Sequence, residues 1–408
     1  MKKSLVLTAM AGALGVSSLQ AQQIDIYVTG ATAFRTSAFS AVSNMFGSAF
    51  VEQNHGSKAV SSGNNQWTMK GQINSLYGAR DVVVHASFNG SVQGIHGIFD
   101  PTDKSIFLAK STSGDLTTVT NTVTIAFSDV NSAATDYPLT DAIERAVAVQ
   151  PFVYARSLNC PASVTNVTIQ QLQTVMGNGR VPLSYLSGNP ADTSKLYLLN
   201  RTKDSGTRVS AFADAMTTGL SPSIYYWSTN AGVMSYTLAT FAQPGAGIFG
   251  YGYVGGGDVT TRMNIVDANN VAIAYLGLSD AKNVNGGQNI IAYNGNYPSS
   301  DMALGVAVPN HPVFDRVING QYSYWSYEVL IQPNTVPASG QDINSTELTS
   351  FCRMLASYDV DENFVGDTTG SIDQDIKVQQ NTPASKVVAI RLGDMKVSRQ
   401  AVGGAIAP

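Results

Sequence analysis

The chain has 408 residues, of which 44% are hydrophobic, so it is long enough for two domains or one large domain with a packed core. Charged residues make up only 13%, roughly half of their usual share, which suits an exported protein better than a cytosolic one. The net charge of −4 argues against nucleic acid as a partner, because nucleic-acid binding depends on basic patches.

Residues 1–21 have the three parts of a secretory signal peptide. Lys2 and Lys3 supply the positive charge, residues 5–16 form an apolar core too short to span a bilayer, and Ala21 precedes the expected cleavage point. No later stretch has 18 unbroken apolar residues, so we expect the mature chain to be soluble or peripheral.

Strand and helix patterns alternate along the rest of the chain. Strands are predicted at 23–28, 81–88, 121–127, 146–155, 195–200, 271–278 and 322–331, and helices at 31–46, 167–179 and 205–216. Residues 146–155 form a long, mainly apolar run, which is typical of a buried parallel strand. In the second helix, Thr168 and Gln171 form a capping box and Gly177 is the expected stop. The pattern predicts an α/β fold with mainly parallel sheets.

Three of these strand-to-helix junctions carry small polar residues. They contain Gly30, Ala31 and Thr32; Ser87, Asn89, Gly90 and Ser91; and Arg201 followed by Ser205, Gly206 and Thr207. The first turn of a helix has unpaired N–H groups and a partial positive charge, so it suits an anion, and an Arg adds a bidentate fork. Each junction could also be an ordinary capped helix. Three together favour convergence on one oxyanion at the carboxyl edge of the sheet.

Taken in order, these segments resemble the phosphate-binding protein of the high-affinity phosphate ABC importer, a type II periplasmic binding protein. TGATAF at 29–34 resembles the first phosphate loop of that family, and SFNGSVQGI at 87–95 resembles the second. IAFSDVNSA at 125–133 resembles its F-x-x-S-D segment, and RTKDSGT at 201–207 has its Arg, three residues, Ser-Gly-Thr spacing. The resemblance covers roughly residues 24–335.

The resemblance implies a fold and a function. The fold would have two α/β lobes joined by crossover strands around a ligand cleft, with 1–21 as signal peptide, 22–149 plus 281–408 as lobe one and 150–280 as lobe two. The protein would be a periplasmic or secreted monomer that binds inorganic phosphate for an inner-membrane permease, with no cofactor and no enzymatic activity. The implied ligand-binding residues are Gly30, Ala31, Thr32, Ala33, Ser87, Ser91, Asp129, Arg201, Ser205, Gly206 and Thr207, with Asp129 accepting the proton that phosphate carries.

Two other functions stay open on the sequence. A secreted surface or matrix protein could keep this fold without transport, and the low-charge, Gly- and Asn-rich composition favours that somewhat. A secreted phosphatase would need a nucleophile or metals beside the anion, and none can be named.

Three further motifs in the sequence are weaker. Cys160 and Cys352 could form a disulfide, but Cys352 lies on the apolar face of a helical pattern, which favours a buried thiol. Gly245, Gly247 and Gly250 spell G-x-G-x-x-G without the strand and helix that a dinucleotide site needs, so we interpret them as a glycine-rich loop. Asp359, Asp361 and Asn363 have calcium-loop spacing without its essential Gly and Glu, so we interpret them as a surface acidic loop.

Overall fold

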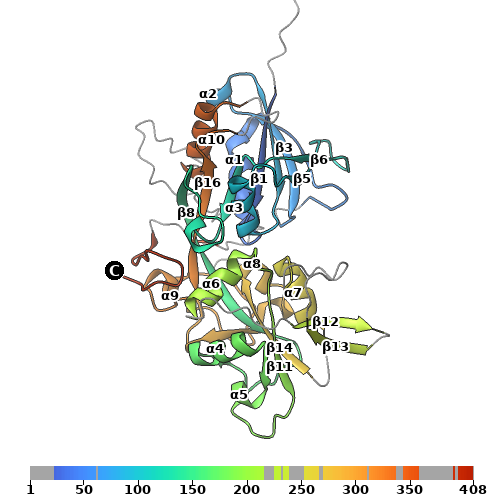
Figure 1. Ribbon diagram of the computed structural model, residues 1–408, viewed down its shortest axis with the longest axis vertical. Helices are drawn as coiled ribbons and strands as arrows, with labels where there is room; N and C mark the ends of the chain where they lie inside the picture. The colour runs from blue at the N-terminus through green and yellow to red at the C-terminus, as the bar shows by residue number, and fades with distance from the viewer. Residues whose placement is uncertain are drawn as a thin grey trace, which may run out of the picture.

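The computed structural model describes residues 23–60, 63–215, 225–230, 233–238, 252–265, 270–309, 312–336, 343–357, 389–390 and 394–407. These residues form two lobes, one above the other in Figure 1, with strands running from one lobe into the other. The α/β architecture expected from the sequence is therefore confirmed. Among the described residues, no helix has the length and apolar character needed to cross a membrane.

The first lobe is built on a mixed sheet. Its strands are β1 (Ile24–Gly30), β2 (Phe50–Asn54), β3 (Gln66–Gln72), β4 (Asp81–Ser87) and β7 (Ile125–Ser128), and β5 (Ser105–Leu108) and β6 (Thr118–Asn121) form a separate hairpin. β1 lies between β4 and β7 and is parallel to both, while β3 and β2 continue the sheet as antiparallel neighbours. The expectation of mainly parallel sheets is thus wrong, because most strand pairs in the described residues are antiparallel and the parallel pairs are few.

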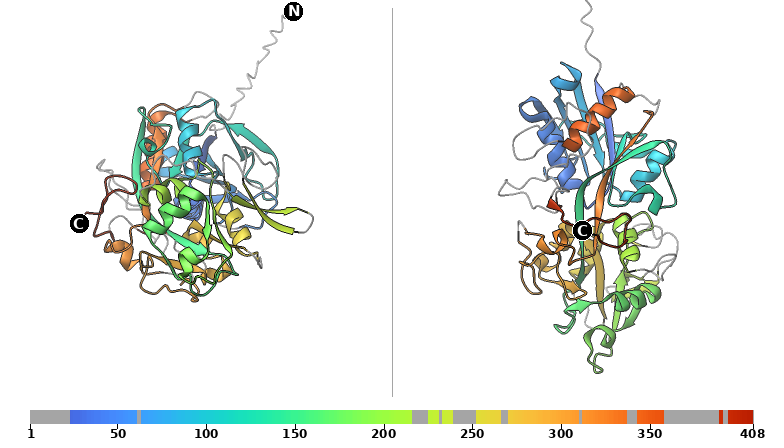
Figure 2. Two further views of the ribbon diagram at one scale, coloured as in Figure 1. Left: turned by 60° about the horizontal axis from the view of Figure 1, so that its bottom comes forward. Right: turned by 90° about the vertical axis from the view of Figure 1, so that its left-hand side faces the viewer.

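Helices cover both faces of this sheet. They are α1 (Arg35–Phe46), α2 (Asn74–Tyr77), α3 (Ser91–Phe99) and α10 (Ser345–Ser357). The buried side chains of α1 and α10 join the main hydrophobic core, whereas those of α3 pack with Val123, Ala126 and Val329 in a second cluster. Figure 2 (right) shows α10 and α3 on opposite sides of the strands.

The second lobe is also built on a mixed sheet with helices, and it contains a parallel pair of strands. Its strands are β9 (Asn166–Val167), β10 (Arg180–Pro182), β11 (Lys195–Leu199), β12 (Tyr225–Asn230), β13 (Val233–Leu238), β14 (Asn270–Gly277) and β15 (Ile290–Tyr293). Its helices are α4 (Ile169–Asn178), α5 (Ser184–Ser187), α6 (Gly206–Asp214), α7 (Gly256–Met263), α8 (Leu278–Ala281) and α9 (Asp315–Ile318). β11 and β14 are parallel neighbours, so their carboxyl ends and the loops that follow lie at the same edge.

Two long strands connect the lobes. β8 (Ala142–Arg156) pairs with β16 (Trp325–Pro333) along its first part and with β14 along its last part. Both pairings are antiparallel, so the parallel strand expected at 146–155 is wrong in its orientation. The reason is that β8 leaves the first lobe while β16 returns to it. Its continuous apolar run instead reflects burial on both faces, since nearly all residues from 147 to 155 are fully buried.

The chain returns to the first lobe later than expected. β15 pairs with the last residues of β8 and with β9, so residues 290–293 belong with the second lobe and not with the first, where 281–408 had been placed. The return is made by β16 from Trp325 onward.

Local capping signals were good guides to helix ends. Thr168 and Gln171 form the predicted capping box of α4 in full. The helix ends at Asn178 and not at Gly177, because it is Gly179 that takes the left-handed conformation, with φ of 70°.

The carboxyl-terminal segment 394–407 packs beside the crossover strands. Arg399 donates hydrogen bonds to the carbonyl oxygens of Trp325 and Ser323, both at 2.8 Å, and its guanidinium lies 4.2 Å from the centre of the Trp325 ring. Gly403 lies against Ala213 at the end of α6. This segment thus touches both the returning strand β16 and a helix of the second lobe (Figure 2).

Both cysteines are buried free thiols in the structure. Burial raises the pKa of each thiol to about 12. Neither is therefore a reactive thiolate at neutral pH.

Candidate anion-binding site

The second and third junctions meet at the carboxylate of Asp129, across the boundary between the lobes. Asp129 follows β7 directly and is 1% exposed. The Ser91 hydroxyl, at the start of α3 in the first lobe, donates to its Oδ1. The Thr207 hydroxyl, in the first turn of α6 in the second lobe, donates to its Oδ2 at 3.4 Å. One buried carboxylate therefore lies between the amino-terminal ends of two helices from opposite lobes.

Gly206 makes this close approach possible. A Cβ atom on Gly206 would collide with Asp129 Oδ1 and would lie 2.6 Å from Ser91 Oγ. Position 206 must therefore be a glycine for the α6 backbone to lie this close to the Asp129 carboxylate.

A backbone contact also joins α3 to the loop before α6. The Val92 N–H donates to the Asp204 carbonyl oxygen at 3.0 Å, and a Cβ atom on Gly90 would lie 2.9 Å from the same oxygen. Gly90 has a φ of 126°, which only glycine adopts readily. The two lobes are therefore in direct contact between α3 and the loop before α6, so the structure is closed there.

Ser205 acts as the N-cap of α6. Its hydroxyl accepts from the Arg208 N–H at 3.3 Å. This local hydrogen bond satisfies one of the unpaired N–H groups of the helix end. Ser205 lies at the start of α6, as expected, but its hydroxyl caps that helix.

Arg201 is a buried cation beside this centre. It is 1% exposed, its Nε donates to the Tyr253 carbonyl oxygen at 3.2 Å and its Nη2 donates to the Val254 carbonyl oxygen at 2.8 Å. Burial lowers the pKa of Arg201, and the negative charges of Asp280 and Asp129 oppose that shift. The guanidinium is thus held rigidly by backbone atoms, which prepares it for a specific contact.

The same environment acts on Asp129. Burial raises the pKa of the Asp129 carboxyl, while the hydrogen bond from Ser91 and the positive charge of Arg201 lower it. Burial is the larger effect, so the pKa of Asp129 is raised overall. Asp129 is the acceptor of this cluster because the Ser91 and Thr207 hydroxyls both donate to its carboxyl oxygens.

Asp280 is the residue that the sequence reasoning missed. It lies in α8, directly after β14, and pairs with Arg35 Nη2 of the first lobe at 3.2 Å. The start of α7 touches it, since a Cβ atom on Gly256 would collide with its carboxylate. The sequence does hold a signal for Asp280, because this Asp in LGLSDA comes shortly after an apolar strand, as Arg201 does. The two strands, β14 and β11, are parallel neighbours, so both residues lie at the same edge of the sheet. Opposite charges therefore alternate from Arg35 through Asp280 and Arg201 to Asp129.

The first junction lies beside this cluster. Gly30 has a φ of 118° and its backbone packs on Phe127, and the Ala31 N–H donates to the Phe127 carbonyl oxygen at 2.7 Å. The Thr32 carbonyl oxygen accepts from Arg35, and Ala33 lies 3.1 Å from where a Cβ atom of Gly277 would be. The Gly30 carbonyl oxygen also accepts from the Gly90 N–H of the second junction at 2.9 Å. This loop therefore supports β7, is joined to the second junction and contacts the second lobe.

Ser91, and not Ser87, reaches the Asp129 carboxylate. The Ser87 hydroxyl accepts from Gln66 Nε2 and from Asn89 Nδ2, both at 3.3 Å. The sequence left both serines open, and their hydrogen bonds distinguish them.

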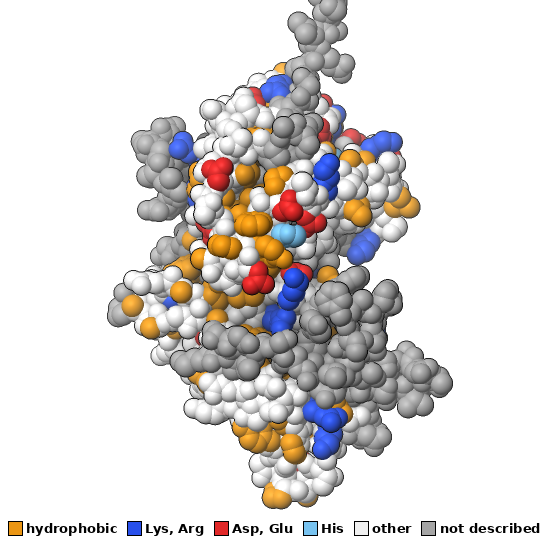
Figure 3. Space-filling model, in the orientation of Figure 1, with side chains coloured by type: hydrophobic (Ala, Val, Ile, Leu, Met, Phe, Trp, Pro, Cys, Tyr) orange, Lys and Arg blue, Asp and Glu red, His pale blue; other side chains and the backbone are white. Residues whose placement is uncertain are grey.

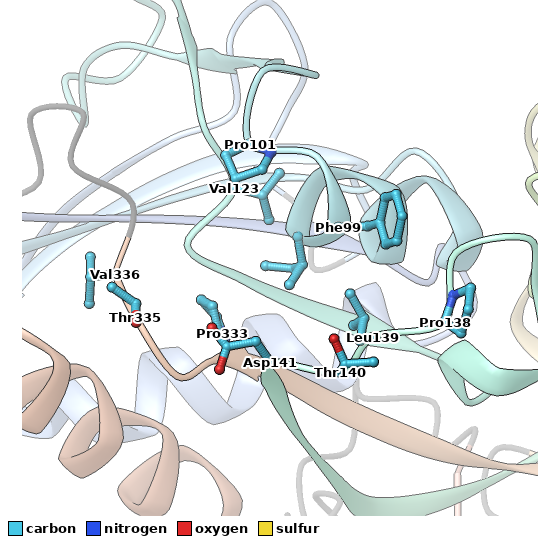
Figure 4. Close-up of a pocket in the computed structure, with 11 residues that line it drawn as sticks. Phe99, Pro101, Val123, Pro138, Leu139, Thr140, Asp141, Pro333, Thr335 and Val336 are labelled. Atoms are coloured by element: carbon cyan, nitrogen blue, oxygen red, sulfur yellow. The ribbon is translucent and has the colours of Figure 1, made fainter.

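An apolar cavity lies elsewhere in the first lobe. It has a volume of about 470 Å3 and lies between the end of α3 and the loops next to β8 and β16, with Ile98, Phe99 and Leu139 among its lining residues (Figure 4). None of the residues that surround Asp129 lines it. It is therefore distinct from the candidate site.

Acidic and basic side chains are interspersed on the face of the molecule that Figure 3 shows.

In the described ranges, no group of three or more His, Cys, Asp and Glu side chains is arranged to hold a metal ion. The glycine motif at 245–250 and the acidic loop at 359–363 lie outside the described residues.

Comparison with known proteins gives a structural likeness. No family model matches the sequence, and no curated protein matches it. Among solved structures, the chain is similar to an ABC-type phosphate transport receptor from Vibrio cholerae, with 14% identity, 81% of this chain and 93% of that chain covered, and a TM-score of 0.41.

Two further structures are similar to the same degree. A phosphate-binding protein from Stenotrophomonas maltophilia has 13% identity, covers 81% of this chain and 82% of its own, and gives a TM-score of 0.40. A human phosphate binding apolipoprotein has 14% identity, coverage of 76% and 82%, and a TM-score of 0.37. At these TM-scores the likeness assigns no function by itself.

Proposed function

We propose that this protein is a solute-binding protein that holds inorganic phosphate, or a similar tetrahedral oxyanion, between its two lobes and delivers it to an ABC-type permease. The signal-like residues 1–21 support a periplasmic or secreted location. Such a role needs no covalent chemistry from the protein.

The observation that carries this proposal is the meeting of two helix ends at one buried point. The first turns of α3 and α6 come from opposite lobes and present the Ser91 and Thr207 hydroxyls to a single negative group, with Arg201 buried nearby. Helix ends, hydroxyl donors and a fixed guanidinium are the groups that bind oxyanions. In the closed structure, the Asp129 carboxylate takes the place of the anion among these donors.

Ligand exchange requires the lobes to separate. Gly206 touches Asp129, and Val92 is hydrogen-bonded to Asp204, so an anion can enter only when these contacts open. An anion bound there would receive hydrogen bonds from both lobes and would thereby favour the closed state over the open one. Asp129 would accept a hydrogen bond from the protonated oxygen of phosphate.

Thermal unfolding of the full chain, stripped of carried-over ligand, tests this function. Phosphate at about 100 times its dissociation constant should add about 2.7 kcal/mol to the free energy of unfolding. Arsenate should stabilise similarly because its shape and protonation are similar, whereas sulfate and molybdate probe the selectivity. An unchanged melting temperature in millimolar phosphate would contradict the proposal.

One observation favours a second candidate. Ser91 and Thr207 already have an acceptor in Asp129, so a protein that keeps the fold as a surface or matrix component without binding an anion would be satisfied as it stands. The same unfolding measurement separates the two, because this second role predicts no response to any oxyanion.

A further inference from the structure

Glu328 is a buried carboxyl group in the strand that returns to the first lobe. It lies on β16, it is 0% exposed, and neither of its carboxyl oxygens has a hydrogen-bond partner in the part of the chain that the structure describes. An ionised carboxylate buried without donors would cost several kcal/mol or more, so such a group normally becomes neutral. The groups next to Glu328 therefore determine whether its carboxyl group is protonated.

The sheet register places Glu328 beside Asp129. β16 runs antiparallel to β7, with Val329 opposite Ser128. The next position along each strand is Glu328 on one side and Asp129 on the other. The pairing of β16 with β8 shifts at a bulge between Glu328 and Val329, so the regular ladder is interrupted where Glu328 lies.

The charge of this carboxyl pair belongs on Asp129. Ser91 and Thr207 donate to Asp129, and Arg201 acts on it electrostatically, whereas Glu328 has no described donor. Among the described titratable groups, Asp129 is the one whose charge acts on Glu328. Burial raises the pKa of Glu328 well above its ordinary value, and the negative charge of Asp129 raises it further.

We propose that Glu328 holds a proton in the folded protein and that an oxyanion bound beside Asp129 tightens its hold, so that anion binding is coupled to proton uptake at Glu328. The coupling rests on the proposed function, whereas the proton on Glu328 does not. The anion would add another negative charge next to the pair, which disfavours ionisation of Glu328. By linkage, the bound anion and the bound proton then strengthen each other.

The first test uses the full chain without ligand and compares it with Glu328→Gln. Gln has a similar shape and stays neutral. At pH values between the unfolded and the folded pKa of Glu328, the unfolded chain has lost this proton while the folded protein keeps it. In that range the free energy of unfolding of the wild type must fall as pH rises. Relative to Glu328→Gln, the unfolding equilibrium constant of the wild type should increase about tenfold per pH unit from about pH 4.3 up to the folded pKa of Glu328, and then level off.

A matched control is Glu347→Gln, because Glu347 is ion-paired with Arg80 at 2.9 Å and is partly exposed. The wild type should show no falling stability with pH relative to this variant. If Glu328→Gln fails to fold, infrared spectroscopy of the wild type at neutral pH should show the carbonyl band of a protonated carboxyl group. A constant stability difference between wild type and Glu328→Gln, or the absence of that band, would overturn the proposal.

The second test measures phosphate affinity by calorimetry for both proteins across the same pH range. Taking the ratio of the two affinities cancels the titration of phosphate itself. Wild-type affinity relative to Glu328→Gln should fall by up to tenfold per pH unit above the pKa of Glu328 in the free protein, and buried Glu residues reach pKa values of about 8–9.

The outcomes separate the two ideas. A pH-dependent ratio supports the coupling, and a constant ratio overturns it. If neither protein binds phosphate, the proposed function fails, and the coupling fails with it, while the ligand-free stability measurement still decides whether Glu328 carries the proton.

Discussion

At the scale of single residues, the candidate site is a set of charges that alternate in sign across the lobe boundary. Arg201 is the central cation, because both Asp280 and Asp129 act on it. Its Nε and Nη2 donors are anchored on backbone carbonyl oxygens, which fixes the plane of the guanidinium. The consequences of removing this group are therefore specific.

Arg201→Ala should weaken phosphate binding by about 2–5 kcal/mol, because it truncates one partner of a buried, charge-assisted contact. Arg201→Lys should recover little of this loss, since an ammonium group cannot form the planar bidentate contact. Calorimetry with phosphate measures both. Arg208→Ala is the matched control, because Arg208 lies in the first turn of α6, shortly after Arg201 in the chain, and its guanidinium lies over the Phe212 ring at 5.2 Å. Wild-type affinity in Arg201→Ala would show that another group holds the anion.

Asp129→Asn should change selectivity more than affinity. Inorganic phosphate near neutral pH is a mixture of its singly and doubly charged anions, each of which keeps at least one proton, and that proton can be donated to Asp129. Sulfate carries none, so the carboxylate faces it as a second acceptor and disfavours its binding. An amide can donate to a sulfate oxygen, so the variant should bind sulfate better relative to phosphate. Calorimetry with both anions at about pH 7.5 measures the ratio, and an unchanged ratio would leave Asp129 without this role.

At the scale of elements, local sequence signals and long-range pairing differed in how well they could be anticipated. The capping box at Thr168 and Gln171 was predicted because both partners lie within one helical turn. The Arg35–Asp280 ion pair was not, because it joins residues 245 positions apart whose proximity depends on the closed lobes. Likewise, an apolar run shows that β8 is buried on both faces but not which neighbours it pairs with.

Thr168→Ala should lower the free energy of unfolding by about 1 kcal/mol, because it removes the side-chain cap of α4. Thr174→Ala is the matched control: it removes the same groups within the same helix, where the Thr174 hydroxyl bonds to the Gln170 carbonyl oxygen and helix propensity favours Ala. Urea unfolding measures both variants. Equal effects of the two substitutions would mean that the cap contributes nothing of its own.

At the scale of the whole molecule, the carboxyl-terminal segment ties the crossover to the second lobe. Arg399 lies 4.0 Å from the buried carboxylate of Asp214 at the end of α6, the helix whose other end lies at Asp129. Burial raises the pKa of Asp214, whereas the charge of Arg399 and a hydrogen bond from the Ser323 hydroxyl lower it. The protonated form is therefore favoured further when Arg399 is lost.

Arg399→Ala should destabilise the protein by about 3–5 kcal/mol at neutral pH, because it leaves a buried carboxylate without its partner. The folded pKa of Asp214 lies above the unfolded value, so its contribution to stability is lost as pH rises, and without Arg399 this loss extends to higher pH. The destabilisation should therefore be smaller in mild acid than at neutral pH. Urea unfolding at both pH values tests this, with Lys396→Ala, an exposed charge on the same segment, expected to change stability by less than about 0.5 kcal/mol. A loss that does not vary with pH would remove Asp214 from the explanation.

The position of β16 between β7 and β8 has a consequence for biosynthesis. β7 ends at Ser128 and β8 begins at Ala142, yet the strand that separates them begins only at Trp325. A chain emerging from the ribosome must therefore keep two open strand edges until roughly its last fifth has been made, and open edges invite pairing with other chains. The nascent protein therefore cannot complete its first lobe until β16 has been synthesised, which lengthens the time for which the incomplete sheet is exposed.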